Sequence, residues 1–230
     1  MAAEPEPSGS AHASAAAPVP PMLIACALGI EQLALRSGRR RHGGTSPGPV
    51  TVLRTGMGPA NAQRAVTRAL EGGELRGAAV VASGFCAGLE PGMHPGDLVV
   101  ADETRGPGGS TLCTGTDLLV DALTRAVPGR TVHSGPLTGS DHVVRGQERA
   151  QLRGTGAIAV DMESAATLRS ALNTGVRSRP VAAVRVVVDA PEHELVRIGT
   201  VRGGISAFRV LRSVLPAFYE WHRSLLLPRR

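Results

Sequence analysis

Short apolar runs and longer amphipathic stretches alternate along the chain. The apolar runs lie at residues 22–28, 50–53, 78–82, 157–160 and 180–190. A run of about four to eight apolar, often β-branched residues that ends at a turn signal is typical of a buried strand. Between these runs apolar residues recur at helical spacing, for example at 31–36 and 61–70. The alternation predicts an α/β fold in which a central sheet has helices on both sides.

Acidic residues follow the ends of two of these runs. The segment DMES, which supplies Glu163, comes directly after the run at 157–160, and Asp189 stands at the end of the run that begins at residue 180. Ligands of open α/β sheets bind at the carboxyl ends of the strands, so we expect Glu163 and Asp189 to face one pocket. Two carboxylates in one pocket can differ in pKa, so that one donates a proton while the other stays ionised and binds substrate.

Two further features lie near predicted strand ends in the first third of the chain. Glu31 follows the run at 22–28. It could belong to the same site, or it could be only the acid that a helix dipole favours in the first turn. The glycine-rich turn TGMGPANA at 55–62, which contains Gly58, precedes the predicted helix at 61–70. Its backbone N–H groups could face an anion or a ribose, although tight turn geometry alone also accounts for such a sequence.

The two ends of the chain differ from the middle. Residues 1–21 consist mainly of Ala, Pro, Ser and Glu and lack the basic and apolar regions of a signal peptide, so we expect a disordered lead. Residues 22–202 form the predicted domain. In the tail at 203–230, apolar and aromatic residues follow helical spacing among arginines. A basic amphipathic helix of this kind can dock on a membrane surface, or it can close the fold by packing on the sheet.

Composition and charge narrow the possible functions. The chain contains 25 arginines and no lysine. The arginines are scattered along the chain and are not grouped with aromatic residues, which argues against a nucleic-acid-binding surface. The 3 cysteines form no CxxC pair, and metal-ligand spacing is absent, so we expect no metal site and a reduced, cytoplasmic protein. No apolar stretch reaches about 18 residues, so we expect no membrane span. If the tail docks, the protein contacts the membrane at its periphery.

The order of motifs resembles the nucleoside phosphorylase and nucleosidase superfamily. The matching segments are IACALGIE (24–31), SGFCAGLEPGMHPGDLVVADE (83–103), DMES (161–164) and RVVVDA (185–190). Within the superfamily, the chain is most similar to the bacterial methylthioadenosine/adenosylhomocysteine nucleosidases, and in particular to the hopanoid-associated phosphorylase or adenosylhopane nucleosidase group. The resemblance covers about residues 22–195. It implies a three-layer α/β/α sandwich with a central mixed sheet, and a homodimer or higher homo-oligomer.

The resemblance also implies roles for individual residues. Glu31 matches the glutamate that handles the attacking water, and Asp189 matches the acid that protonates purine N7. Glu163 matches the glutamate that binds the 2′ and 3′ hydroxyls of the ribose, and Met162 matches the methionine that lies against the sugar. Gly58, in its glycine-rich turn, is a further candidate for substrate binding.

Other matching positions carry substitutions that change the expected pocket. Gly84, Phe85 and Cys86 occupy the turn that packs around the sugar and base, but Phe85 stands where the nucleosidases have a small residue. Val143 stands where the family usually has an aromatic residue under the purine, so we expect weaker stacking on the base. Val188 replaces the usual serine before the aspartate, so a hydrogen bond that would set the pKa or the aim of this aspartate is lost.

These features together predict an enzyme that cleaves the N-glycosidic bond of a purine nucleoside and releases adenine. The resemblance points to adenosylhopane, in hopanoid biosynthesis, and to water as the nucleophile, because the Gly-Asp-Pro-x-Arg opening of the phosphorylases is absent. No cofactor is expected, although phosphate stays open as a co-substrate. Methylthioadenosine, adenosylhomocysteine and futalosine are alternative substrates. A non-catalytic nucleoside-binding module is the alternative of another class, but it would be expected to lose the three carboxylates.

Overall fold

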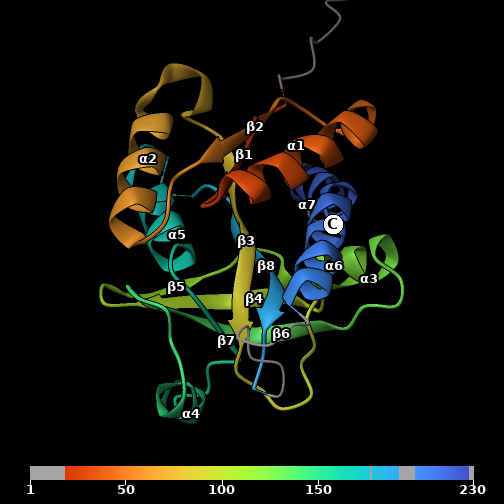
Figure 1. Ribbon diagram of the computed structural model, residues 1–230. Helices are drawn as coiled ribbons and strands as arrows, with labels where there is room; N and C mark the ends of the chain where they lie inside the picture. Colours follow the sequence, from red (N-terminus) through yellow and green to blue (C-terminus); the bar gives the residue numbers. More distant parts are fainter. Residues whose placement is uncertain (1–18, 177, 192–199, 228–230) are drawn as a thin grey trace, which may run out of the picture.

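The computed structural model describes residues 19–176, 178–191 and 200–227. These residues form a mixed β-sheet with helices on both sides (Figure 1), which confirms the predicted fold class. The strands are β1 (Met22–Cys26), β2 (Val50–Arg54), β3 (Ala79–Gly88), β4 (Leu98–Gly106), β5 (Gly109–Leu112), β6 (Val132–Gly139), β7 (Ala159–Asp161) and β8 (Val181–Asp189). The helices are α1 (Gly29–His42), α2 (Pro59–Glu71), α3 (Thr116–Ala126), α4 (Gln147–Gly154), α5 (Ser164–Asn173), α6 (Thr200–Ser213) and α7 (Leu215–Leu226), with short 3-10 turns η1 (Gly43–Thr45) and η2 (Gly73–Leu75).

Five strands of the sheet pair in a closed ring. β3 pairs with β7, β7 with β6, β6 with β4, β4 with β8, and β8 again with β3. β1 and β2 extend the sheet from β3 as parallel neighbours, and β5 forms a hairpin with β4. In Figure 1, β4 and β6 cross β3 and β8, so the sheet curls. β1, β3 and β8 run parallel, so their carboxyl ends point in the same direction; β1 ends near Ala82 of β3, and β8 ends beside Ala87.

Two apolar clusters fill the two sides of the sheet. In β1, Met22, Ile24 and Cys26 belong to one cluster, whereas Leu23 and Ala25 belong to the other. This is the alternation expected of a strand that is buried on both faces. α1, α3, α6 and α7 cover the first cluster, and α2 and α5 cover the second.

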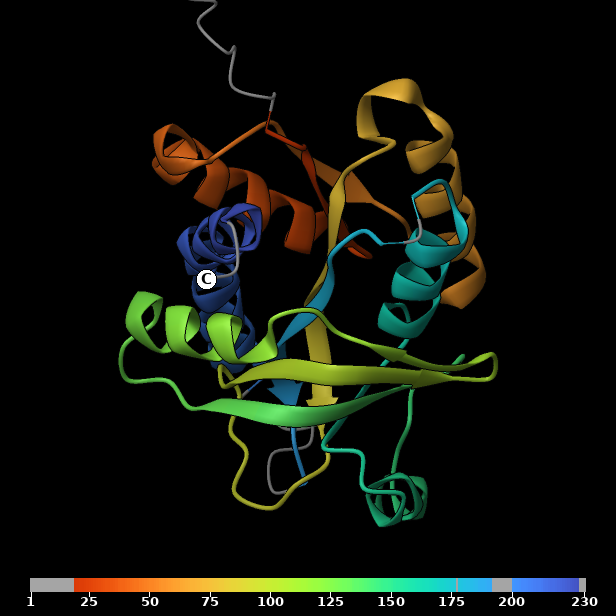
Figure 2. The ribbon, with the colours of Figure 1, turned by 180° about the vertical axis from the view of Figure 1, so that it is seen from behind.

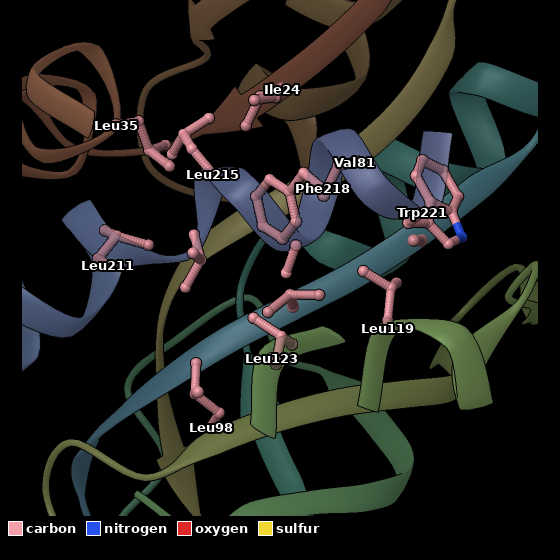
Figure 3. Close-up of a cluster of buried hydrophobic side chains, with 14 of the residues drawn as sticks. Ile24, Leu35, Val81, Leu98, Leu119, Leu123, Leu211, Leu215, Phe218 and Trp221 are labelled. Carbon is pink, nitrogen blue, oxygen red and sulfur yellow. The ribbon is translucent and has the colours of Figure 1, made fainter. Parts of the chain in front are cut away.

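The C-terminal helices α6 and α7 contribute large side chains to the first cluster. Leu215, Phe218 and Trp221 are fully buried and pack against α1, α3 and the sheet (Figure 3). The indole N–H of Trp221 donates a hydrogen bond of 2.7 Å to the carbonyl of Thr114. Burial of these aromatic side chains matches the packing alternative for the tail. In the part of the chain that the structure describes, no helix is long and apolar enough to cross a membrane.

Helix α4 has a different position from the other helices. It lies apart from them, beyond the crossing strands, in both views (Figures 1 and 2). Its residue Leu152 packs against a small apolar cluster that contains Leu89, Val144 and Val160. α4 therefore borders the region where β3 ends and β7 begins.

Candidate active site

One cavity of about 230 Å³ lies where several strands end, and it gathers most of the predicted site residues. The lining includes seven of them, which come from α1, β3, the loop before α4, the β7–α5 junction and β8: Glu31, Phe85, Cys86, Val143, Met162, Glu163 and Asp189. Gly58 and Gly84 do not line the cavity but contact carboxylates that do. The structure thus brings the three predicted carboxylates to one place, as expected for residues that follow strand ends.

Glu31 is held rigidly by backbone groups. It stands in the first turn of α1 and its side chain is buried. Oε2 accepts hydrogen bonds from the backbone N–H of Ala27 (2.9 Å) and of Leu28 (2.8 Å), while Oε1 accepts one of 2.7 Å from the N–H of Phe85. Glu31 therefore links the start of α1 to β3. An acid that only interacts with the dipole of its own helix would not make the contact with β3.

Glu163 lies at the start of α5 and is also buried. Its Oε1 accepts a hydrogen bond of 2.7 Å from the backbone N–H of Gly58. Gly58 has φ of 89°, a conformation that glycine adopts without strain, so the glycine-rich turn presents its N–H group to this carboxylate. Burial raises the pKa of Glu163, and the cation of Arg185 opposes this rise. The β7–α5 junction places Glu163 here because Asp161, not Glu163, accepts the N–H of Ser164 at the helix start.

Arg185, in the middle of β8, carries the positive charge among these carboxylates. Its Nε atom lies 2.5 Å from Oδ2 of Asp161 and donates a hydrogen bond of 2.9 Å to Oγ of Ser164. Burial lowers the pKa of Arg185, but the negative charges of Asp161, Glu163 and Glu31 outweigh burial and raise it. The guanidinium is therefore charged and stabilises three acidic side chains at once.

Arg185 was not among the predicted site residues, although the sequence contains a signal for it. A single charged residue inside the apolar run at 180–190 must have a partner when the strand is buried.

Gly84 shows how closely the side chains of Glu31 and Arg185 approach β3. A Cβ atom at Gly84 would lie 2.5 Å from Oε1 of Glu31 and 2.6 Å from Nη1 of Arg185, so only glycine leaves room for both side chains.

Asp189 is buried at the end of β8, and its partner is Arg149 of α4. Nη2 of Arg149 donates a hydrogen bond to Oδ2 of Asp189, and both side chains are 8% exposed. Nothing in the polar sequence of α4, QERAQLRG, indicates this contact.

The remaining lining residues are mainly apolar. Val143 and Met57 are exposed at 56% and 55%, and they form an apolar mouth, whereas Phe85 is half-buried. Val143 is thus at the entrance rather than beneath a deep base site. Burial raises the pKa of Cys86 far above its ordinary value, so this thiol is protonated and acts as part of the apolar wall.

A family model described as the phosphorylase superfamily matches residues 30–215 of the chain. The chain belongs to this superfamily. The match confirms the superfamily that the motifs predicted, and with it the class of enzyme, a nucleosidase or nucleoside phosphorylase. A search of curated protein sequences finds no match.

Solved structures of nucleosidases share the fold. The S-adenosylhomocysteine nucleosidase from Streptococcus pyogenes, in complex with 5-methylthiotubericidin, is 17% identical with a TM-score of 0.69, over 94% of this chain and 100% of that chain. The methylthioadenosine/S-adenosylhomocysteine nucleosidase from Neisseria meningitidis, in complex with methylthio-immucillin-A, is 18% identical with a TM-score of 0.67, over 87% of this chain and 99% of that chain. The corresponding enzyme from Colwellia psychrerythraea, in complex with adenine, is 16% identical with a TM-score of 0.68, over 90% and 96% of the two chains.

Proposed function

We propose that the protein hydrolyses the N-glycosidic bond of an adenine nucleoside, with Asp189 at the leaving base, Glu163 at the ribose and Glu31 at the attacking water. The observation that carries this proposal is the convergence of these three buried carboxylates in one cavity at the ends of β1, β7 and β8. A non-catalytic binding module would not need to keep three charged groups out of water, because burying them is costly.

In the proposed step, Asp189 delivers a proton to N7 of the purine, and the bond between C1′ and N9 breaks with its electron pair going to the base. The ribose becomes positively charged, and the Glu163 carboxylate beside it stabilises that charge and binds the ribose hydroxyls. Water then adds to C1′ and loses a proton to Glu31. General acid or base help of this kind contributes about 10²–10⁴-fold per group.

The cavity favours water over phosphate as the nucleophile. A phosphate co-substrate requires free cationic or N–H donors. Of the described residues, the arginine that lines the cavity is Arg149, and it is already paired with Asp189. Arg54 is exposed and does not line the cavity, while the N–H of Gly58 is bound to Glu163. Apart from Nη1 of Arg149, which has no partner among the described residues, phosphate would have to displace one of these contacts to find a donor.

The apolar mouth favours a nucleoside with an apolar 5′ group, and we propose adenosylhopane, in hopanoid biosynthesis. Large apolar side chains such as Met57 and Val143 seldom stay exposed beside a cavity unless they meet a ligand or a partner. Because this substrate carries a lipid, we propose that the protein is a cytoplasmic homo-oligomer that contacts the membrane at its periphery. Methylthioadenosine or adenosylhomocysteine is the second candidate, because the solved structures with this fold include nucleosidases named for these compounds.

Adenine release tests the proposal. Wild type and Asp189→Asn would be incubated with adenosylhopane or with methylthioadenosine, each with and without phosphate. We expect release from adenosylhopane without phosphate, and a loss of about 10²-fold or more in Asp189→Asn. A strict requirement for phosphate would overturn hydrolysis, release from methylthioadenosine alone would overturn the lipid-linked substrate, and release from neither would overturn the function.

A further inference from the structure

We propose that Arg149 is a positioning residue of this site, which holds Oδ2 of Asp189 so that Oδ1 meets the leaving purine. The proposal rests on the proposed function, since it gives Asp189 the leaving base. It concerns a residue on α4, a helix that lies apart from the other helices (Figures 1 and 2) and supplies none of the three carboxylates.

Two hydrogen bonds hold the side chain of Arg149, one to the loop before α4 and one to the end of β8. Its Nε atom donates a hydrogen bond of 3.3 Å to the carbonyl of Val144, and its Nη2 atom donates to Asp189. The neighbouring Glu148 lies 2.9 Å from Nε2 of His142, and the carboxylates of Asp141 and Glu148, which accept hydrogen bonds from the imidazole, raise the pKa of His142. α4 is therefore anchored beside the cavity at two consecutive residues, and the buried one of the two reaches Asp189.

Two atoms of the pair lack partners. Oδ1 of Asp189 and Nη1 of Arg149 are buried without a hydrogen-bond partner among the described residues. Buried polar atoms are nearly always satisfied, so an unsatisfied acceptor and donor side by side in a cavity wall indicate a bound group that completes them. Because Oδ2 is occupied by Arg149, Oδ1 is the oxygen that remains for the base.

Residue 188 explains why a distant arginine is needed. Val188 is half-buried in the cavity lining and has no hydroxyl with which to orient the carboxylate that follows it. A carboxylate without a fixed partner rotates about its side-chain torsions, and misplacement by about 1 Å can lower a rate about 10²-fold. Arg149 supplies this orientation from another element. A buried ion pair is weak evidence for stability in general, which leaves a functional role as the better account of its presence.

The test compares Arg149→Met and Arg149→Lys with wild type, using adenine release from adenosylhopane and methylthioadenosine. Arg153→Met is the matched control, since Arg153 is on the same helix but its pair with Glu90 is 3.5 Å long and about half-exposed (50% and 40%). We expect Arg149→Met to lower kcat by about 10²-fold with a smaller change in KM. Arg149→Lys should recover part of kcat, and Arg153→Met should match wild type.

A double variant separates positioning from a general structural effect. If Arg149 acts through Asp189, Arg149→Met should cost little further activity in an Asp189→Asn background, and thermal unfolding should show both proteins folded. This inference alone would be overturned if Arg149→Met lowered activity by the same factor in the wild-type and Asp189→Asn backgrounds. It would also be overturned if wild type were active and Arg149→Met were equally active. A wild type that releases no adenine would overturn the proposed function and this inference with it. If Arg149→Met does not fold, Arg149→Lys carries the test, and a wild-type kcat in that variant would also overturn the inference.

Discussion

At the residue scale, the three carboxylates of the cavity have different surroundings and therefore different chemical properties. Glu31 accepts three backbone N–H groups, Glu163 accepts one, and Asp189 is paired with an arginine. Burial raises the pKa of Glu163. These surroundings are consistent with the proposed roles of Glu31 at the water, Glu163 at the sugar and Asp189 at the base.

Glu163→Gln tests the contact with the ribose. The amide keeps the shape but removes the negative charge that stabilises the positive ribose, so we expect kcat/KM for adenine release to fall by about 10²-fold or more. Glu220→Gln is the control, because Glu220 is exposed and pairs with Arg125 on the surface. Equal activity of the two variants would contradict the role of Glu163. The raised pKa of Glu163 also predicts that wild-type activity declines on acidification at a higher pH than an ordinary glutamate would give.

Gly84→Ala tests the close packing beneath Glu31. Its φ of 153° and a Cβ atom 2.5 Å from Oε1 of Glu31 make any side chain strained, so we expect a destabilisation of about 1–3 kcal/mol and a displaced carboxylate with reduced kcat. Gly44→Ala is the matched control, since no atom lies within 4 Å of its added Cβ. Thermal unfolding and adenine release of the two variants would be measured together; similar values for both would contradict the packing argument.

The carboxylates of the site could be predicted from the sequence, but only one of its two arginines could be. Glu163 and Asp189 could be found because each follows an apolar run that forms a strand, and position after a strand is a local property. Arg185 was detectable in principle, as a charge within a buried strand. Arg149 was not, because its helix is polar over most of its surface and its contact with Asp189 spans 40 residues.

At the element scale, the strands and the helices that pack on them follow the apolar pattern, whereas short or polar elements do not. β1 and β8 lie inside the predicted runs, and α2 contains the predicted helix at 61–70, with Pro59 at its start. The closure of the ring through β4 and β6 depends on pairings between distant segments, which periodicity cannot show. The predicted tail is divided into α6 and α7 at Val214, and Pro216 stands in the first turn of α7.

Helix α7 also carries a titratable group in the core. His222 is 1% exposed, and neither ring nitrogen has a partner among the described residues. Burial lowers the pKa of His222 in the folded protein below its value of about 6.5 in the unfolded chain. The unfolded chain therefore binds this proton more readily, so the contribution to stability is complete above about pH 6.5 and is lost as the pH falls below it.

We expect His222→Leu to remove this part of the acid sensitivity. The free energy of unfolding would be measured by denaturant titration at pH 7.5 and at pH 5.5. The decrease in this free energy between the two pH values should be smaller in His222→Leu than in wild type. Each unit by which folding lowers the pKa of His222 within this pH range accounts for about 1.4 kcal/mol of the difference. His42→Leu, near the partly exposed end of α1, serves as the control. An unchanged pH dependence in His222→Leu would show that the histidine is accommodated in both charge states.

At the scale of the whole molecule, the curled sheet determines where the chemistry can occur. β1, β3 and β8 run parallel, β7 pairs antiparallel with the end of β3, and α4 lies beside that end. This arrangement places residues from the first, middle and last parts of the chain around one cavity. The superfamily match over residues 30–215 includes all three carboxylates, so the fold and the site belong to the same unit.

The most direct test of the account is an isotope experiment on the bond that is broken. The protein would be incubated with its adenine nucleoside in H₂¹⁸O, with phosphate present, and the sugar product would be examined by mass spectrometry. The account predicts free adenine and a ribosyl product that carries ¹⁸O at C1′, because water attacks that carbon. An unlabelled ribosyl 1-phosphate would contradict it, since phosphate would then be the nucleophile.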